Sequence, residues 1–327
     1  MRSSSTATNS TAITVAICTY NNAVLLNRVL ASVEQQHIRS EHTWSTLVMD
    51  NNSSDATRDV VQRYMDRGLI PGLQYVREKR QGLGFARRRA VLHTESDLIA
   101  FVDDDCLLAP DWVEQAMVFY QGHPTIGAVG GRVQLLWEST PGDIALRYAS
   151  MLAEQNFGDA PRRLYSVGLV GAGIVLRRTA LIESGWLDRM IMTDRRGNKL
   201  SAHGDTEMLL RIRNVGYELW YNPVMRLEHY IPRQRMSLDY LCRLQRGGSR
   251  GLGIVSALAD NKKPSFRQRL GTLDRAVLGF ARFSLSVVVQ DLLLKQRIGS
   301  PERRMLFYNL LGQLEGAWDA LPGRFDI

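Results

Sequence analysis

The sequence predicts an α/β fold with a mainly parallel central sheet flanked by helices and a C-terminal helical extension. In the first half of the chain, short apolar runs alternate with amphipathic stretches, a pattern typical of βαβ units. Beyond Ser237 the chain becomes basic, apolar and mostly helical in pattern. Its 327 residues suffice for one large domain or two.

Three strand–helix pairs predict the parallel part of the sheet. They are strand 13–18 with helix 24–34, strand 46–49 with helix 55–65, and strand 98–102 with helix 112–120. From Ala128 onward the pattern loosens, and glycines predict turns at 130–131, 171–173 and 197. A helix at 206–215 and a short strand at 217–221 complete this part.

These patterns divide the chain into three segments. Residues 1–11 are rich in Ser and Thr and lack the apolar core of a signal peptide, so we expect a disordered leader. Residues 12–236 form the predicted α/β domain, and residues 237–327 form the predicted helical region.

Charge and cysteine content narrow the partners and the compartment. Lys and Arg number 41 against 33 Asp and Glu, and this net charge of +8 favours anionic partners: phosphorylated substrates, a membrane surface or nucleic acid. The three cysteines are too few and too scattered for a disulfide framework or a zinc site. We therefore expect a reducing, cytoplasmic location.

The most apolar segment of the helical region, 276–294, is not predicted to span a membrane. Arg282, Gln290 and Asp291 interrupt it. Plotted as a helix, it has one narrow polar stripe and an otherwise apolar surface. Such a helix packs among other helices, or lies in a membrane interface at the inner face of the membrane.

Three consecutive carboxylates, Asp103, Asp104 and Asp105, follow the apolar strand at 98–102. Ligand sites of open α/β sheets lie at the carboxyl ends of such strands. Adjacent carboxylates repel one another, so keeping them ionised requires a cation or many hydrogen-bond donors. Oxygen ligands suit Mg²⁺ or Mn²⁺. The alternative is a solvated acidic turn that caps the helix following Pro110.

Further motifs surround this acidic run in a fixed order. They are VAICTYNN at 15–22, VMDNNSSDAT at 48–57, GLGFARR at 82–88, GAGIVLRR at 171–178, GWLD at 185–188 and GDTE at 204–207. Together with Asp103–Asp105 they resemble the family 2 glycosyltransferases, whose GT-A fold is Rossmann-like. The resemblance extends over residues 14–248, and the order of the motifs is more specific than any one of them.

The resemblance implies a set of donor-binding residues: Thr19, Tyr20, Asn21, Asp50, Gly82, Arg87, Asp103 and Asp104. Within this set, Asp50 matches the aspartate that contacts the nucleotide base, and Arg87 matches the arginine near the diphosphate. Arg88 stands where the family usually has Asn. From the residues alone, Asn21 is equally typical of a turn and Asp50 of a helix cap.

The resemblance also implies a metal site for Mn²⁺ or Mg²⁺. Asp105 takes the role of the metal-binding aspartate, Asp103 lies towards the ribose and the metal, and His229 completes the site. A partly buried histidine with ordinary hydrogen bonds is the alternative for His229. Arg233 and Arg235 follow closely and are candidates for pyrophosphate contacts, or belong to a solvated basic surface.

The family's Glu-Asp motif matches Gly204-Asp205, which implies that Asp205 is the general base of an inverting reaction. Because Gly204 replaces the glutamate, Glu207 remains a second candidate for the base. Both carboxylates could instead cap a helix. The implied acceptor region comprises Gly171, Ala172, Gly173, Trp186 and Glu207, and we expect a flexible loop over the site at 195–199.

We therefore predict an inverting, metal-dependent glycosyltransferase that moves a sugar from a nucleotide-sugar to an acceptor hydroxyl. UDP is the habitual nucleotide of the family, and the product would belong to glycan or glycoconjugate synthesis. One alternative is a nucleotidyltransferase or sugar pyrophosphorylase, but the basic Gly-rich loop expected after the first strand is replaced by Thr19–Asn22. A non-enzymatic, basic membrane- or nucleic-acid-binding module is another alternative, but it does not explain the acidic run at 103–105. We expect no nucleic-acid partner.

Overall fold

The computed structural model describes residues 11–39, 42–166, 168–195, 200, 202–255, 271–283 and 300–319. The predicted leader therefore lies outside the described residues except for Thr11, as do residues 196–199 of the predicted loop. Within the described ranges, one nine-stranded sheet has the strand order β3-β2-β1-β4-β8-β6-β9-β5, with β7 paired to β9.

The strands are β1 (Ala12–Thr19), β2 (Thr43–Asp50), β3 (Gln74–Arg77), β4 (Leu98–Asp103), β5 (Cys106–Leu108), β6 (Ile126–Trp137), β7 (Arg162–Leu164), β8 (Ile174–Arg177) and β9 (Glu218–Ile231). The helices are α1 (Ala23–Glu34), α2 (Thr57–Arg67), α3 (Leu83–His93), α4 (Trp112–Tyr120), α5 (Asp143–Arg147), α6 (Arg178–Glu183), α7 (Gly204–Asn214), α8 (Leu238–Val255) and α10 (Pro301–Asp319). Short 3₁₀ turns occur at Ala149–Leu152 and Arg233–Met236.

The predicted α/β fold with a mostly parallel sheet is confirmed. The longest ladders, β1–β2, β1–β4 and β6–β9, are parallel. Because β1 lies between β2 and β4, the carboxyl ends of all three strands meet at one edge of the sheet. There Cys18 is paired with Asp103, and Thr19 with Asp50. This edge is where the ligand site of such a sheet is expected.

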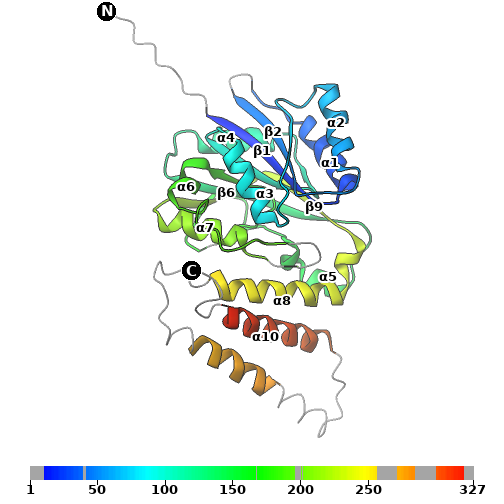
Figure 1. Ribbon diagram of the computed structural model, residues 1–327, viewed down its shortest axis with the longest axis vertical. Coiled ribbons are helices and arrows are strands. Elements are labelled where there is room, and N and C mark those ends of the chain that lie inside the picture. Colours follow the sequence, from blue (N-terminus) through cyan, green and yellow to red (C-terminus); the bar gives the residue numbers. More distant parts are fainter. Residues whose placement is uncertain are drawn as a thin grey trace, which may run out of the picture.

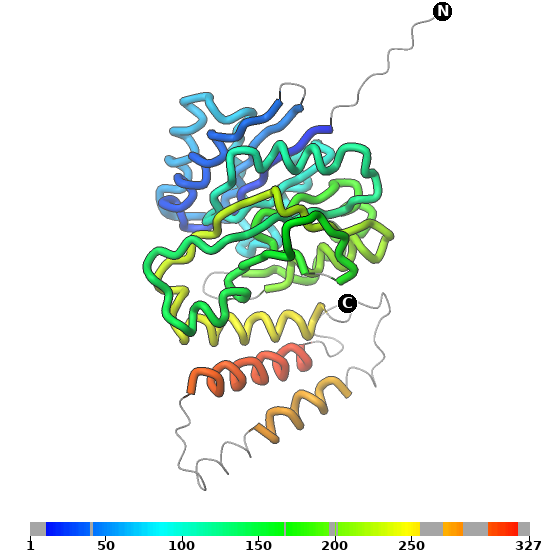
Figure 2. The backbone as a smooth tube through the Cα atoms, turned by 180° about the vertical axis from the view of Figure 1, so that it is seen from behind, coloured from blue at the N-terminus to red at the C-terminus, as the bar shows by residue number. Residues whose placement is uncertain are grey.

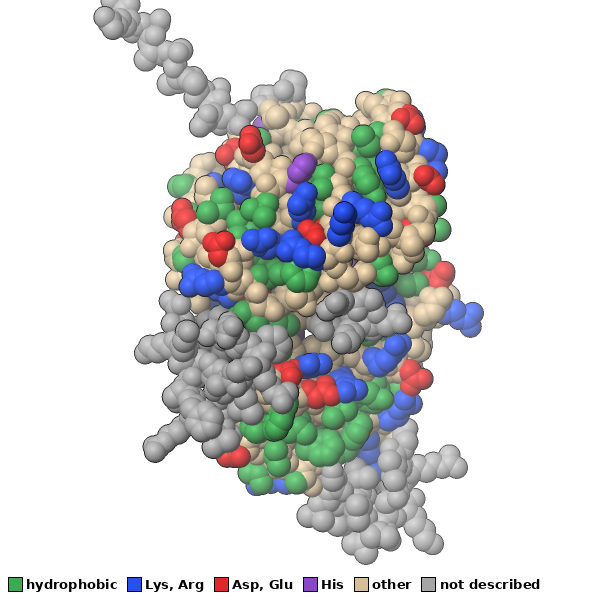
Figure 3. Space-filling view, viewed as in Figure 1, with side chains coloured by type: hydrophobic (Ala, Val, Ile, Leu, Met, Phe, Trp, Pro, Cys, Tyr) green, Lys and Arg blue, Asp and Glu red, His purple; other side chains and the backbone are tan. Residues whose placement is uncertain are grey.

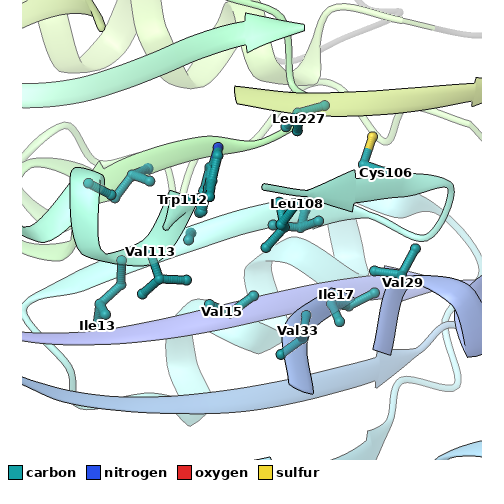
Figure 4. Packing of buried hydrophobic residues seen from close by; sticks show 14 of the residues in the cluster. Ile13, Val15, Ile17, Val29, Val33, Cys106, Leu108, Trp112, Val113 and Leu227 are labelled. Carbon is teal, nitrogen blue, oxygen red and sulfur yellow. The ribbon is translucent and has the colours of Figure 1, made fainter. Parts of the chain in front are cut away.

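Alternating side chains of β1 pack against helices on both faces of the sheet. Ile13, Val15 and Ile17 belong to a core that includes residues of α1, α2 and α4 (Figure 4). Ala16 and Cys18 belong to a second core with residues of α3, α6 and α7. Successive side chains of a strand point to opposite faces of the sheet, and here both faces are buried. The fold therefore has three layers, with the sheet between two layers of helices (Figure 1).

One prediction was wrong: Gly130 and Gly131 do not form a turn but lie inside strand β6. A register shift in the β6–β9 ladder occurs between Gly130 and Arg132. A Cβ atom on Gly131 would lie 1.8 Å from the Met225 carbonyl oxygen, so the close approach of two backbones requires glycine there. Nothing in the local sequence distinguishes this role from a turn.

Strand β9 is much longer than the predicted 217–221 segment, since it continues to Ile231. Its second half pairs with β6 on one side and with the short strand β5 on the other. In the β5–β9 pair, Cys106 lies opposite His229. The extended strand therefore delivers a histidine to the chain segment that follows the acidic run.

The helical C-terminal region is present as predicted. Helix α8, helix α10 and a helix at 271–283 stack below the α/β part in both backbone views (Figures 1 and 2). No helix among the described residues is long and apolar enough to cross a membrane. Residues 284–294 of the predicted amphipathic helix lie outside the described ranges.

Candidate active site

A cleft of about 830 Å³ opens at the carboxyl edge of β1 and β4. Many of the residues predicted for the site line it: Thr19, Tyr20, Asn21, Arg87, Asp103, Asp104, Asp105, Gly171, Ala172, Asp205 and His229. They come from segments far apart in the sequence. The cleft therefore brings together the predicted donor, metal and base residues.

Asp104 holds the turn that follows β1. Its carboxylate accepts hydrogen bonds from Thr19 Oγ1 at 2.6 Å and from Asn22 Nδ2 at 2.9 Å. Asn21 in the same turn has a φ of 48° and accepts a hydrogen bond from the Ser54 amide at 2.8 Å. The middle carboxylate of the acidic run thus shapes the turn predicted to bind the donor.

Asp105 and His229 form a buried pair. His229 Nε2 lies 3.4 Å from Asp105 Oδ1, and His229 Nδ1 donates a hydrogen bond to the Leu152 carbonyl at 2.8 Å. Nε2 is therefore the ring atom that faces the carboxylate, and a histidine held through its other nitrogen in this way has the usual arrangement of a metal ligand. The Cys106 thiol belongs to the same cluster, whose ligand atoms lie within 4.8 Å of one another.

The charges around this pair favour an ionised carboxylate and a neutral thiol. Burial alone would raise the pKa of Asp105, but the His229 ring and the Arg235 guanidinium outweigh it and hold the pKa well below the usual range. Arg235 Nη1 lies 2.8 Å from Asp105 Oδ2. Burial and the nearby carboxylates raise the pKa of the Cys106 thiol. Asp105 and His229, rather than Cys106, therefore offer the donor atoms suited to Mn²⁺ or Mg²⁺.

Arg87 lies between two carboxylates that come from different parts of the chain. Its guanidinium is 3.5 Å from Asp103 Oδ1 and 3.4 Å from Asp194 Oδ2, and its side chain is only 5% exposed. A buried guanidinium requires such partners because an unpaired buried charge is costly. Arg87 therefore joins the end of β4 to the loop that precedes α7.

Asp205 lies in the first turn of α7, in direct contact with the predicted acceptor segment. Its Oδ2 accepts a hydrogen bond from the Gly171 amide at 2.8 Å, and its Oδ1 accepts one from the Thr206 amide at 2.7 Å. A Cβ atom on Gly171 would lie 2.8 Å from Asp205 Oδ2 and 2.9 Å from Arg87 Nη2. Glycine at 171 thus lets the backbone reach both side chains.

The structure does not bring every predicted site residue into the cleft. Glu207 is fully buried, and its carboxylate accepts hydrogen bonds from the Ile191 and Met192 amides and pairs with Arg211 at 2.8 Å. Trp186 is 1% exposed and packs in the core shared with α3, α6 and α7. Neither side chain lines the cleft, which differs from the expectation of an acceptor role.

Asp50, Gly82 and Gly173 lie beside the cleft rather than in its lining. Asp50 is 1% exposed, and its carboxylate accepts hydrogen bonds from the Ser53 amide at 2.8 Å and the Tyr75 hydroxyl at 2.6 Å. The Gly82 amide donates to Asn51 Oδ1 at 2.7 Å. Asp50 and Gly82 thus hold the end of β2 and the start of α3 in place, whereas Gly173 directly precedes β8.

A second cavity of about 680 Å³ adjoins the cleft on the side of α8. Four residues line both spaces: Met151, Ala202, His203 and Leu244. The His203 ring contacts the Gly248 carbonyl of α8 at 2.8 Å and Thr206 Oγ1 of α7 at 3.0 Å. The first turn of α7 is therefore linked directly to the helical region.

Residues 14–185, more than half of the chain, match the sequence profile described as Glycosyl transferase family 2. The chain belongs to glycosyltransferase family 2. It is 25% identical over 238 residues to the glucosyl-dolichyl phosphate glucuronosyltransferase of Haloferax volcanii, a match covering 70% of this chain and 72% of that protein. A shorter match, 34% identical over 112 residues, relates it to the validoxylamine A glucosyltransferase of Streptomyces hygroscopicus subsp. jinggangensis, covering 34% of this chain and 26% of that one.

Solved structures confirm the GT-A fold of this glycosyltransferase. The mannosyltransferase PcManGT from Pyrobaculum calidifontis, in complex with GDP-Man and Mn²⁺, aligns with a TM-score of 0.63 at 19% identity over 95% of this chain and 88% of that one. The S. aureus TarS 1–349 complex with UDP-GlcNAc aligns with a TM-score of 0.53 at 16% identity, covering 95% and 81%.

Sequence reasoning on this family 2 glycosyltransferase missed two groups that shape the site. One is Asp194, the buried partner of Arg87, which follows no motif and lies in a segment without periodicity. The other is the Leu152 carbonyl, which fixes the His229 ring. A backbone carbonyl leaves no signature in the residue types, so only the folded chain reveals it.

Proposed function

We propose that this glycosyltransferase is inverting and metal-dependent, and that it moves a sugar from a nucleotide-sugar, with UDP as the expected nucleotide, to an acceptor hydroxyl in glycan or glycoconjugate synthesis. The observation that carries the proposal is the composition of the cleft. The Asp105–His229 pair and the Asp205 carboxylate line the same space. An inverting transfer needs these two functions, neutralisation of the leaving group and a base for the acceptor.

Asp105 and His229, with Asp103 beside them, would hold the cation. Their donor atoms fit a divalent ion because the Asp105 carboxylate, whose pKa is held low, faces His229 Nε2, while His229 Nδ1 is bound to the Leu152 carbonyl. When bound, the cation neutralises the charge that develops on the leaving diphosphate. Arg235, and Arg195 at the rim of the cleft, supply further positive charge facing the same space.

Asp205 would take the proton of the acceptor hydroxyl as the new bond forms. The amides of Gly171 and Thr206 fix the carboxylate in one orientation, and each oxygen keeps a lone pair for the acceptor. Glu207 is unsuited to this role because backbone amides and Arg211 already occupy its carboxylate.

The first test of this proposal is a donor screen. The protein is incubated with Mn²⁺ and, separately, UDP-glucose, UDP-N-acetylglucosamine, UDP-glucuronic acid and GDP-mannose, and release of the nucleoside diphosphate is measured. We expect slow hydrolysis of one UDP-sugar, because water can replace the acceptor beside Asp205. Preferred hydrolysis of GDP-mannose would refute the UDP assignment, and hydrolysis undiminished by EDTA would refute metal dependence.

We also propose that the helical region contacts the inner face of a membrane. Val277 and Leu278, in the helix at 271–283, are 49% and 54% exposed, and Leu306 and Phe307 of α10 are also exposed. Figure 3 shows hydrophobic side chains gathered on these helices. Contiguous exposed apolar side chains mark interaction sites more often than plain surface.

The three cysteines bear on the compartment. They are free and buried, in keeping with the cytoplasmic location we propose.

Vesicle sedimentation tests this contact. The protein is expected to sediment with anionic vesicles of phosphatidylcholine and phosphatidylglycerol at low salt, and less so as salt is raised, because its net charge is +8. The Val277→Gln/Leu278→Gln variant should sediment less, whereas Leu69→Gln, which changes an exposed leucine outside this region, should not. Absence of sedimentation at low salt would favour plain packing of the helix.

A further inference from the structure

Gly204 stands where the family motif has a glutamate, and the structure shows what occupies the space of the missing side chain. A Cβ atom on Gly204 would lie 1.9 Å from Asp194 Oδ2 and 2.4 Å from Asp194 Cγ. No side chain can therefore be added at position 204 while the Asp194 carboxylate stays in place. A carboxylate is present at this point of the site, but it comes from another segment of the chain.

The Asp194 carboxylate makes two contacts that matter for the site. Its Oδ1 accepts a hydrogen bond from the Gly204 amide at 2.6 Å, at the first residue of α7. Its Oδ2 lies 3.4 Å from Arg87 Nη1. Negative charge is favourable at a helix N-terminus, and the buried Arg87 guanidinium needs an opposing charge. Asp194 thus fixes the residue immediately before Asp205 and the arginine that contacts Asp103.

The loop that carries Asp194 is fixed on both sides. The Ile191 and Met192 amides donate to Glu207, and the Thr193 and Arg195 carbonyls accept hydrogen bonds from the Gly84 and Leu83 amides of α3 at 3.1 Å. Asp194 itself has a φ of 55°, a left-handed conformation that is uncommon outside glycine but that Asp and Asn adopt more readily than other residues. The contacts on both sides of it therefore hold the Asp194 carboxylate in place.

We propose that Asp194 is the positioning residue that replaces the motif glutamate in this enzyme. Its carboxylate holds Arg87 and the first turn of α7, and through them it sets the position of the base Asp205 relative to Asp103. This inference rests on the proposed role of Asp205. It accounts for the glycine at position 204, because the loop before α7 supplies the carboxylate that the motif glutamate would otherwise supply.

The proposal is tested by removing the carboxylate at position 194 and introducing one at position 204. Asp194→Gly removes it and tolerates the positive φ, whereas Gly204→Glu introduces a side chain into occupied space. Each single variant is expected to lower kcat for hydrolysis of the preferred donor by about 100-fold, as displacement of a catalytic group by about 1 Å does. The double variant Asp194→Gly/Gly204→Glu should recover at least about tenfold of that loss. The matched control Asp194→Gly/Gly204→Gln fills the same space without charge and should remain impaired.

Two further measurements keep the test decisive. Thermal unfolding should show that Gly204→Glu destabilises the wild-type background more than the Asp194→Gly background, independently of activity. Asp194→Asn keeps the shape and tolerates the positive φ, so it should fold and yet lose kcat because Arg87 keeps only Asp103 of the two carboxylates that hold it.

Asp205→Asn is assayed alongside, to separate this inference from the proposed function. If Asp205→Asn is inactive while Asp194→Gly and Asp194→Asn have wild-type kcat, this inference alone is overturned. It is also overturned if the Glu and Gln double variants are equally active. If Asp205→Asn retains wild-type kcat, the base assignment falls instead, whatever the Asp194 variants do.

Discussion

Asp205→Asn is expected to lower the rate of sugar transfer by about 10²–10⁴-fold, the usual cost of losing a positioned general base. The neutral amide cannot take the proton of the acceptor hydroxyl. Its single amide oxygen can still accept a hydrogen bond from either the Gly171 or the Thr206 amide, which now donate to different oxygens of Asp205, so the fold and the affinity for UDP should survive the loss of the other. The measurements are kcat for hydrolysis or transfer, UDP affinity by calorimetry, and the thermal unfolding midpoint.

Two other carboxylates serve as comparisons. Asp143 lies in the first turn of α5, is exposed and does not line the cleft, so Asp143→Asn should retain wild-type activity. Glu207→Gln should lower the unfolding midpoint, because the buried Glu207 carboxylate accepts hydrogen bonds from two backbone amides and pairs with Arg211. If Asp205→Asn is active while Glu207→Gln is folded but inactive, the general base is Glu207 and not Asp205. If both variants remain active, the inverting mechanism itself fails.

Asp105→Ala is expected to abolish the dependence of UDP binding on Mn²⁺. The carboxylates of Asp103 and Asp105 face the space where a diphosphate would bind, and without a cation they repel it. In the wild-type protein, calorimetry should therefore show much tighter UDP binding with Mn²⁺ than with EDTA. Direct binding of Mn²⁺, followed by electron paramagnetic resonance, supplies a second readout that requires no turnover.

His229→Ala separates the two interpretations of this histidine. If Nε2 is a metal ligand, Mn²⁺ affinity should fall by at least about 10–100-fold, the range known for groups that merely support a ligand. His93→Ala, which changes an exposed histidine outside the cleft, should leave Mn²⁺ affinity unchanged. Unchanged affinity in His229→Ala would show that the ring only makes structural hydrogen bonds. Equal UDP affinity in Mn²⁺ and in EDTA would refute the metal site as a whole.

The parts of the fold that depend on local periodicity were predictable. Helix α4 has the predicted bounds, and the predicted strands 13–18 and 98–102 lie within β1 and β4. Their side chains alternate between two cores, so the apolar pattern alone indicates burial on both faces. The order of motifs likewise identified the family. Several of the motifs lie where a strand ends or a helix begins: 15–22 at the end of β1, 48–57 at the end of β2, 82–88 at the start of α3 and 204–207 at the start of α7.

The second half of the sheet was not predictable in the same way. Strands β6 and β9 contain glycines, a proline and polar residues, and each becomes a strand because it pairs with the other over most of its length. Gly131 is a strand residue only because the Met225 backbone passes close to it. Such pairing joins residues far apart in the chain, and tertiary contacts override local preference there.

The sequence by itself determined which chemical groups this glycosyltransferase carries: the acidic run at 103–105, the histidine at 229, the aspartate at 205 and the glycine in place of glutamate at 204. Only the tertiary structure decided which contacts, and therefore which role, each carboxylate has. Asp104 shapes a turn, Asp105 faces His229, Glu207 holds a loop, and Asp194 occupies the space beside Gly204. The physical reason is that a carboxylate's role depends on its hydrogen-bond donors and its burial, and both are set by segments brought together only on folding.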